Sequence, residues 1–194
     1  KDQSAEEKKL LLLRIDTIKK DIYSIEENIR VLTQKLPSPV GPLQNVKKDL
    51  TLSLDLIYRL KPILQHVDSL LAKNSAKTYL LLFANNMELR PGGGFIGSFG
   101  LLQVKDYSIE EIKIYDVYDA DGQLIAHVEP PDAIRKYLGQ PHWFLRDSAF
   151  SPDFLENYAQ AKYFLEKEMG FKNFSGSFLI TTSAIQYLLG AFDD

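Results

Sequence analysis

The stretch YLLLFANNMELRPGGGFIGSFGLLQV, residues 79–104, decides how the rest of the chain is interpreted. It begins and ends with apolar runs, Tyr79–Phe83 and Phe99–Val104, which have the length and composition of buried strands. Between them, Glu88 and Arg90 are the only charged residues, and three successive glycines follow. Glycine permits a positive φ or a close backbone approach, which an ordinary connecting loop rarely needs. The stretch predicts either a functional loop between two core strands or a tight turn in which Glu88 and Arg90 pair locally.

The composition of the chain is that of a globular protein. It has 194 residues, of which 45% are hydrophobic and 25% charged, and its formal net charge is −3. This charge argues against a general nucleic-acid binder, so we expect no nucleic-acid partner. The sequence contains no cysteine, which excludes disulfides and thiolate chemistry, and no apolar run of about 18 residues that would span a membrane. Because it starts without methionine and stops directly behind an apolar segment, we expect a fragment whose globular domain is truncated at the C-terminus.

The first part of the chain, residues 1–76, is predicted to be a long antiparallel helical hairpin. Apolar residues recur at alternating spacings of four and three over residues 11–36, and again over residues 46–71, which is the heptad pattern of coiled coils. The proline-rich segment 37–42 between them cannot continue a helix. We expect a stalk, a spacer or an oligomerisation element that is able to contact a protein partner.

The second helix of this hairpin carries an additional apolar stripe outside the heptad seam, at Leu52, Leu56, Ile63 and Leu70. Two interpretations are open. The stripe packs against something besides the first helix, such as the domain that follows, or it only thickens the two-helix core.

Residues 77–194 alternate between strand and helix patterns, which predicts an α/β or α+β sheet domain with covering helices. Strands are expected from about residue 78 to 83 and over 99–105, 109–117 and 177–182, and helices over 132–138, 154–169 and 184–192. A turn at 106–108 should join the second and third strands into a β-hairpin. Parallel and mixed sheets remain open.

A second unusual segment is QPHWFLRDSAFSPDF, residues 140–154. An irregular segment this rich in aromatic and charged residues is more often functional than an average loop. Ser151 as an N-cap, with Pro152 in the first turn, explains Asp153 as part of a helix start. Asp147 has no such structural explanation, so it is a candidate functional residue.

The polar residues of these segments form one candidate site: Asn85, Asn86, Glu88, Arg90, Gly93, Gly94, Asp116, Arg146 and Asp147. Arginine binds phosphate or carboxylate with two parallel hydrogen bonds, and a glycine-rich backbone can add N–H donors. Two arginines near strand ends could therefore hold an anionic ligand. The alternative is that Arg90–Glu88 and Arg146–Asp147 are structural ion pairs.

Other motifs in this part of the chain predict no metal. The three histidines are far apart in the sequence, so we do not expect a zinc site. Asp121-Gly122 is expected to be a plain turn rather than part of a calcium loop, because apolar residues stand at ligand positions of such a loop.

The motifs NNMELRPGGGFIGS, residues 85–98, and LRDSAFSPDF, residues 145–154, resemble the bacterial domain-of-unknown-function family DUF4012. The resemblance covers residues 78 to about 192. It implies a membrane-anchored protein whose domain lies outside the cell, with the helical hairpin between anchor and domain. We therefore expect an extracytoplasmic location, with the anchoring segment absent from this sequence.

More distantly, the order of elements is similar to that of the LytR-CpsA-Psr phosphotransferases, which transfer glycopolymers from polyprenyl-phosphate carriers to the cell wall. That resemblance implies that Arg90 and Arg146 hold phosphate, and that Asp116 and Asp147 are catalytic or hold a magnesium ion. The chain departs from the pattern at residues 94–98, which stand where those enzymes carry arginine and aspartate.

Two functions follow from these patterns. The first is an envelope protein that binds an anionic glycan or a lipid phosphate and acts as a glycopolymer phosphotransferase. The second is a non-enzymatic scaffold or interaction module of the envelope. The sequence leaves open whether the chain is an enzyme.

Overall fold

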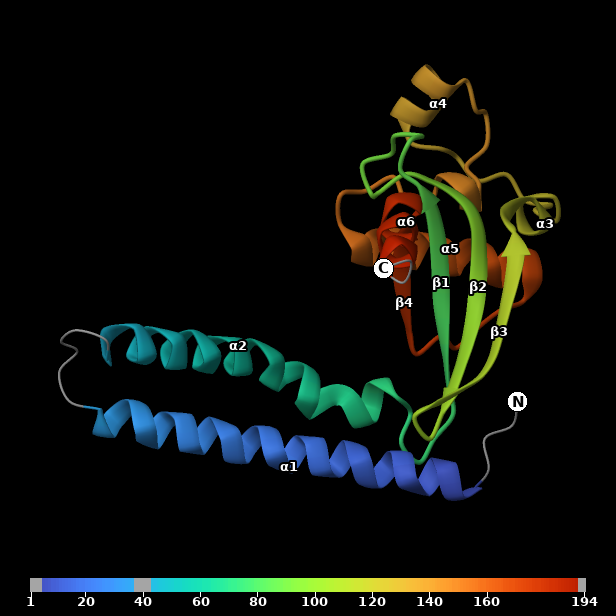
Figure 1. The fold of residues 1–194 in the computed structure, drawn as a ribbon. Helices are drawn as coiled ribbons and strands as arrows, with labels where there is room; N and C mark the ends of the chain where they lie inside the picture. The colour runs from blue at the N-terminus through green and yellow to red at the C-terminus, as the bar shows by residue number, and fades with distance from the viewer. Residues whose placement is uncertain (1–4, 37–42, 192–194) are drawn as a thin grey trace. The chain divides into compact units, whose positions relative to one another are not determined.

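The computed structural model describes residues 5–36 and 43–191 (Figure 1). The chain forms two compact units. The first is Lys1–Ala76 together with Lys105–Ser108, and the second is Lys77–Val104 together with Ile109–Asp194. The turn predicted at 37–42 lies outside the described residues.

The first unit is built on two long helices, α1 (Ala5–Lys35) and α2 (Leu43–Leu70), which lie side by side and run in opposite directions (Figure 1). The predicted helical hairpin is therefore confirmed. Lys61 Nζ of α2 donates to Glu26 Oε1 of α1 at 2.9 Å, and Lys19 of α1 pairs with Asp68 of α2. Among the side chains described in these two helices, none is buried. No described helix of the chain is both long enough and apolar enough to cross a membrane.

A short turn completes this unit. The backbone N–H groups of Asp106 and Tyr107 donate to carbonyls of the segment that ends α2, and the Tyr107 hydroxyl donates to Asp68 Oδ1 at 2.6 Å. The hydrogen bonds from Lys19 and Tyr107 lower the pKa of Asp68 to about 2, and burial together with the Asp68 contact raises the pKa of Tyr107 to about 12. Asp106 and Tyr107 both have positive φ, as the two-residue turns of tight β-hairpins require.

The second unit contains a four-stranded sheet in the order β3-β2-β1-β4 (Figure 1). Its strands are β1 (Lys77–Asn85), β2 (Phe95–Lys105), β3 (Ser108–Asp116) and β4 (Gly176–Thr181). β1 pairs with β2 antiparallel and with β4 parallel, so the sheet is mixed. β2 begins earlier than expected, because a register shift between Phe83 and Ala84 lets the pairing continue up to the glycine loop.

The helices of this unit are α3 (Val117–Asp121), α4 (Asp132–Leu138), η1 (Leu145–Asp147), α5 (Phe154–Met169) and α6 (Thr182–Gly190). Three details of the sequence interpretation were wrong. The plain turn at Asp121-Gly122 is the end of the short helix α3, and the N-cap of α5 is Asp153, not Ser151. The last helix was expected to start at residue 184, but α6 starts at Thr182 and is capped by Thr181, whose side chain accepts from Ala184 N.

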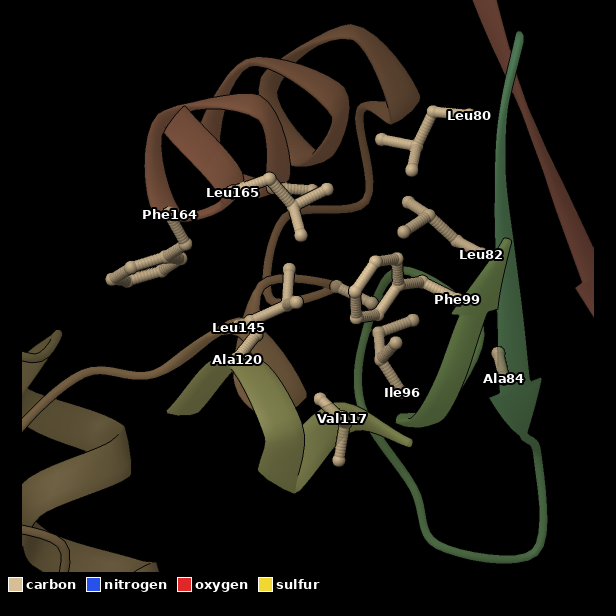
Figure 2. Close-up of a cluster of buried hydrophobic side chains, with 12 residues drawn as sticks. Leu80, Leu82, Ala84, Ile96, Phe99, Val117, Ala120, Leu145, Phe164 and Leu165 are labelled. Carbon is tan, nitrogen blue, oxygen red and sulfur yellow. The ribbon is translucent and has the colours of Figure 1, made fainter. Parts of the chain in front are cut away.

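One face of the sheet carries the core (Figure 2). Leu80 and Leu82 of β1 and Phe99 of β2 point toward Phe164 and Leu165 of α5, and all five side chains are fully buried. Burial of apolar area at about 25 cal/mol per Å² is the main driving force for this packing. The loops that carry the candidate site are thus attached to a rigid, well-packed sheet.

The opposite face is covered less completely. Alternation along the strands places Phe83 and Ile180 there, and α6 approaches them through Ile185. Ile114 and Phe178 remain 64% and 45% exposed. Apolar side chains are therefore shielded from water on the α5 side of the sheet and partly exposed to it on the α6 side.

Candidate functional site

The loop that follows β1 and the 3-10 helix η1 are joined by an ion pair between Arg90 and Asp147. Arg90 Nε lies 2.8 Å and Arg90 Nη2 lies 2.7 Å from Asp147 Oδ1. The two side chains are 13% and 2% exposed. Arg90 does not pair with Glu88, as the local alternative proposed, because Glu88 instead accepts from the Asn85 amide at 3.1 Å. Charge-assisted bonds in such a dry setting fix the loop to η1.

A second ion pair lies beside the first. Arg146 Nη1 donates to Asp121 Oδ2 at 2.9 Å, and Leu145 N donates to Asp121 Oδ1 at 2.9 Å. The Arg146 guanidinium also lies 4.1 Å from the centre of the Phe144 ring, a cation–π contact, and 3.8 Å from Asp147. Sequence reasoning missed Asp121, because the Asp-Gly dipeptide at the end of α3 has the composition of a turn.

Burial raises the pKa of Asp121 to about 6, although the Arg146 guanidinium and the backbone donors oppose this shift. The direction follows from the desolvation of a carboxylate that is only 2% exposed. At neutral pH the carboxylate is still mainly ionised and balances the arginine.

A third carboxyl group, Glu168 of α5, was not anticipated. Its side chain is buried and both carboxylate oxygens lack a hydrogen-bond partner among the described residues. Burial, followed by the negative charge of Asp121, raises the pKa of Glu168 to about 7, and Arg146 opposes the shift. A buried carboxyl without partners favours its neutral form. Glu168 therefore titrates close to neutral pH.

The glycines connect the two sequence motifs directly. Gly92 N donates to Ala149 O at 3.0 Å, and a Cβ at Gly92 would lie 2.1 Å from Asn157 Nδ2. Asn157 in turn holds the second motif, because its side chain bonds both the N–H and the carbonyl of Ser151. Any side chain at Gly92 would separate the loop from the start of α5.

Gly93 and Gly94 have φ of +118° and +129°, which L-residues rarely adopt. A Cβ at Gly94 would lie 2.2 Å from Asn85 O. The glycine run is thus required by backbone geometry and close packing.

The remaining candidate residues are also used within the fold. Asn86 exchanges hydrogen bonds with Ser183 at the start of α6. Asp116 is the N-cap of α3, where its side chain accepts from Tyr118 N at 2.9 Å. Asp116 is exposed and takes part in neither ion pair among the described contacts. The structure therefore brings Arg90, Arg146 and Asp147 together, and gives Asp116 a separate place.

An open hollow of about 380 Å³ lies at the α6 side of the sheet. Its lining consists of Phe83, Ala84, Asn85, Gly97, Ser98, Ile114, Ile180, Thr182 and Ile185. Of the predicted site residues, only Asn85 lines it. Its walls are mainly apolar, which suits a hydrocarbon group more than a phosphate.

Two of the histidines that are distant in sequence meet in the structure. The Nδ1 atoms of His127 and His142 lie 2.6 Å apart, and His127 Nε2 lies 2.9 Å from Glu129. Both histidines are exposed. Within residues 5–36 and 43–191, no group of three or more His, Cys, Asp or Glu side chains is arranged to hold a metal ion.

The chain was compared with known families, curated proteins and solved structures. The family described as "Protein of unknown function (DUF4012)" matches residues 74–194, so the chain belongs to this family. No curated protein and no solved structure gave a significant match.

Proposed function

We propose that this member of the DUF4012 family is a non-enzymatic structural and interaction module of the bacterial cell envelope. One observation carries the proposal. Each of the two arginines expected to bind an anion is matched by a carboxylate that is 2% exposed, Asp147 for Arg90 and Asp121 for Arg146. A phosphate would have to displace a buried carboxylate from either arginine, which leaves a desolvated charge without a partner. The two motifs then serve to join the glycine loop, η1 and α5.

The envelope location is supported by the family resemblance of the two motifs, in which the domain lies outside the cytoplasmic membrane. It can be tested on intact cells of the source organism, with a membrane-impermeant lysine reagent and an antibody against this domain. Labelling without cell lysis is expected. Labelling only after lysis would refute the extracytoplasmic location.

The non-enzymatic role is tested by thermal unfolding with and without polyprenyl phosphate and Mg²⁺, for the wild type and for Arg90→Ala and Arg146→Ala. A ligand that binds only the folded state raises the melting temperature by mass action. We expect no rise for the wild type, and lower melting temperatures for both variants in every buffer. A rise in the wild type that both variants lose would refute the proposal and would place an anion site at the arginines.

The second candidate is binding of a lipid phosphate or an anionic glycan, and with it the transferase activity that uses Mg²⁺. The mainly apolar hollow of about 380 Å³ favours it, because such a surface could accept part of a polyprenyl chain. Thr182→Trp would place a bulky ring at the rim of this hollow. A ligand-induced rise in melting temperature that Thr182→Trp abolishes, while the arginine variants retain it, would identify a lipid site at the hollow.

A further inference from the structure

The helical hairpin has too little core to stand alone. None of the side chains described in α1 and α2 is buried, although both helices carry apolar residues along their whole length. In proteins, most of the stability of a helix comes from packing its apolar face against another element. The positions of the exposed apolar side chains on α1 and α2 indicate which partner covers them.

Each heptad seam divides into two sets. In α1, Ile15, Ile22 and Ile29 are partly buried, as are Leu50, Ile57 and Leu64 in α2. Most of the intervening seam positions are left open: Ile18, Ile25 and Leu32 in α1, and Val46 and Leu60 in α2, are between 43% and 53% exposed. Leu11 and Val67, at two other intervening positions, are partly buried. α1 and α2 therefore use only half of each seam against one another.

The open positions lie on one side of the hairpin. At 100° per residue, Ile18, Ile25 and Leu32 are rotated by about 50° from the positions that contact α2. Val46 and Leu60 are rotated by about the same angle, in the same sense, from the positions that contact α1. Because the two helices run antiparallel, equal rotations lead to the same side of the pair (Figure 1).

Four further exposed residues of α2 extend this surface. Leu52, Leu56, Ile63 and Leu70 are between 44% and 60% exposed, and they lie further around α2 in the same direction as Leu60. We call the whole surface the open face. Its members are Ile18, Ile25, Leu32, Val46, Leu52, Leu56, Leu60, Ile63 and Leu70.

We propose that two copies of this chain pack their open faces together as an antiparallel four-helix bundle with a two-fold axis, so that the hairpin is a homodimerisation element. The proposal is independent of whether the sheet domain binds a ligand. It names the partner as a second copy because the open face is self-complementary in both spacing and charge.

Four of the α2 members of the open face are placed symmetrically about residue 58, whereas Leu52 and Ile63 fall opposite Leu64 and Ser53. Leu56 and Leu60 lie two residues on either side of this position, and Val46 and Leu70 lie twelve residues on either side. A two-fold axis across α2 at residue 58 would therefore set Leu56 against Leu60 of the second copy, and Val46 against Leu70. An isologous interface requires this correspondence, since each patch meets its own copy.

The first helix agrees with the same axis. The pairs Glu26–Lys61 and Lys19–Asp68 show which residues of α1 and α2 lie level, and in both pairs the residue numbers add to 87. Residue 58 of α2 is therefore level with residue 29 of α1. Ile25 and Leu32 lie four and three residues on either side of residue 29, so one axis serves both helices.

The charges at the edge of the open face are complementary as well. Asp55 and Arg59 form an exposed pair at 2.8 Å on the side of α2 that faces away from α1. Across an axis at residue 58, Arg59 of one copy would lie within about 3 Å, measured along the helix, of the level of Asp55 of the other. Opposite charges therefore meet at this edge, as in antiparallel coiled coils.

The first test is the mass of the whole chain in solution, measured by sedimentation equilibrium over a range of concentrations. We expect twice the monomer mass of 22.1 kDa for the wild type. The double variant Leu56→Glu/Leu60→Glu should weaken the dimer by at least about 100-fold, because it places four carboxylates in the interface. Leu13→Glu is the matched control: Leu13 is 57% exposed but lies on the opposite side of α1, so the dimer should persist. A wild-type chain that stays at 22.1 kDa at the highest concentration would refute the proposal.

The second test does not depend on disrupting the interface. The sequence has no cysteine, so single cysteines can be placed at will. Arg59→Cys puts the two thiols about 3 Å apart along the helix, whereas His66→Cys, on the same edge, puts them about 24 Å apart. A short bismaleimide should link Arg59→Cys chains into dimers and leave His66→Cys chains unlinked. Equal linking at both sites, or linking only at residue 66, would overturn this arrangement.

Discussion

The sheet unit and the hairpin unit place their side chains in very different environments. In the sheet unit, Leu80, Phe99 and Phe164 are completely buried, and the buried carboxylates of Asp121 and Asp147 are paired with arginines. In the hairpin, every described side chain of α1 and α2 is at least partly exposed, including the apolar ones. The sheet unit buries its apolar side chains within itself, whereas the hairpin unit leaves an apolar surface exposed.

The ion pairs of the two units differ in the same way. Arg90–Asp147 and Arg146–Asp121 are nearly dry, whereas Asp55–Arg59 of α2 is more than half exposed on both sides. Loss of one partner from a buried pair strands a desolvated charge, but an exposed pair exchanges its partner for water. Ion pairs of the same residue types therefore hold the loops of the sheet unit in place, whereas on the helices of the hairpin they contribute little to stability. The first two of the following predictions compare a site in the sheet unit with a matched, exposed site.

The largest effect is expected for Gly94→Ala. Gly94 combines a positive φ with a Cβ position 2.2 Å from Asn85 O, so the loop must move. We expect a loss of more than about 4 kcal/mol in the free energy of unfolding, measured with urea. Gly139→Ala is the control, because Gly139 also has a positive φ but has no atom within 4 Å of its Cβ position. It should lose only about 1 kcal/mol. Similar losses for the two variants would contradict the close packing at Gly94.

The next effect is expected for Arg146→Met, which leaves Asp121 buried without its cation. The free energy of unfolding should fall by about 3–5 kcal/mol. Arg135→Met is the matched variant, since Arg135 pairs with Glu129 and Asp132 at the surface and is half exposed. No measurable change is expected there. If Arg146→Met were equally silent, Arg146 would be available to a ligand.

A smaller, pH-dependent effect is expected for Glu168→Gln. The folded state raises the pKa of Glu168 to about 7, so the acid form is favoured, and the stability it contributes is present below its ordinary pKa of 4.5. That stability is lost as the pH rises through about 7. The free energy of unfolding of Glu168→Gln should therefore be about 1–3 kcal/mol higher than that of the wild type at pH 8. At pH 4 the two free energies should be similar. Parallel curves of stability against pH for the two proteins would show that Glu168 is not responsible.

The smallest effect is expected in the hairpin. Lys61→Met removes the cross-helix contact with Glu26, but Lys61 is accessible to water. Such pairs contribute little and are screened by salt. We expect no measurable change in the melting temperature at 0.5 M NaCl. A clear loss at high salt would mean that this pair is more strongly desolvated than its exposure indicates.

Much of the fold could be predicted from the sequence, because periodicity reports local structure. The seams of α1 and α2 and the strands around residues 78–83 and 99–105 follow from apolar spacing alone. α4 was predicted with its observed bounds. The cap of α5 was misassigned by two residues, because Ser and Asp are both present there and are interchangeable as caps.

The candidate site was harder to predict, because pairing between distant residues leaves no local pattern. Arg90 pairs across 57 positions with Asp147, and Arg146 across 25 with Asp121. The sequence offered nearer partners for both arginines: Glu88, which does not pair with Arg90, and Asp147, which Arg146 does contact at 3.8 Å in addition to Asp121. Glu168 lies three and four residues after Leu165 and Phe164, so it continues the buried face of α5, a signal that the sequence interpretation did not use.

The most direct test of the structural role of the two motifs is a double-mutant cycle between Arg90 and Asp147. The free energy of unfolding is measured with urea for the wild type, Arg90→Leu, Asp147→Leu and the double variant. We expect each single change to lower the free energy of unfolding by about 3–5 kcal/mol. The double variant should lose about 2 kcal/mol less than the sum of the two single losses, because neither charge is then left without a partner. Single variants that are as stable as the wild type, with additive changes in the free energy of unfolding, would contradict this role. Arg90 would then again be a candidate ligand-binding residue.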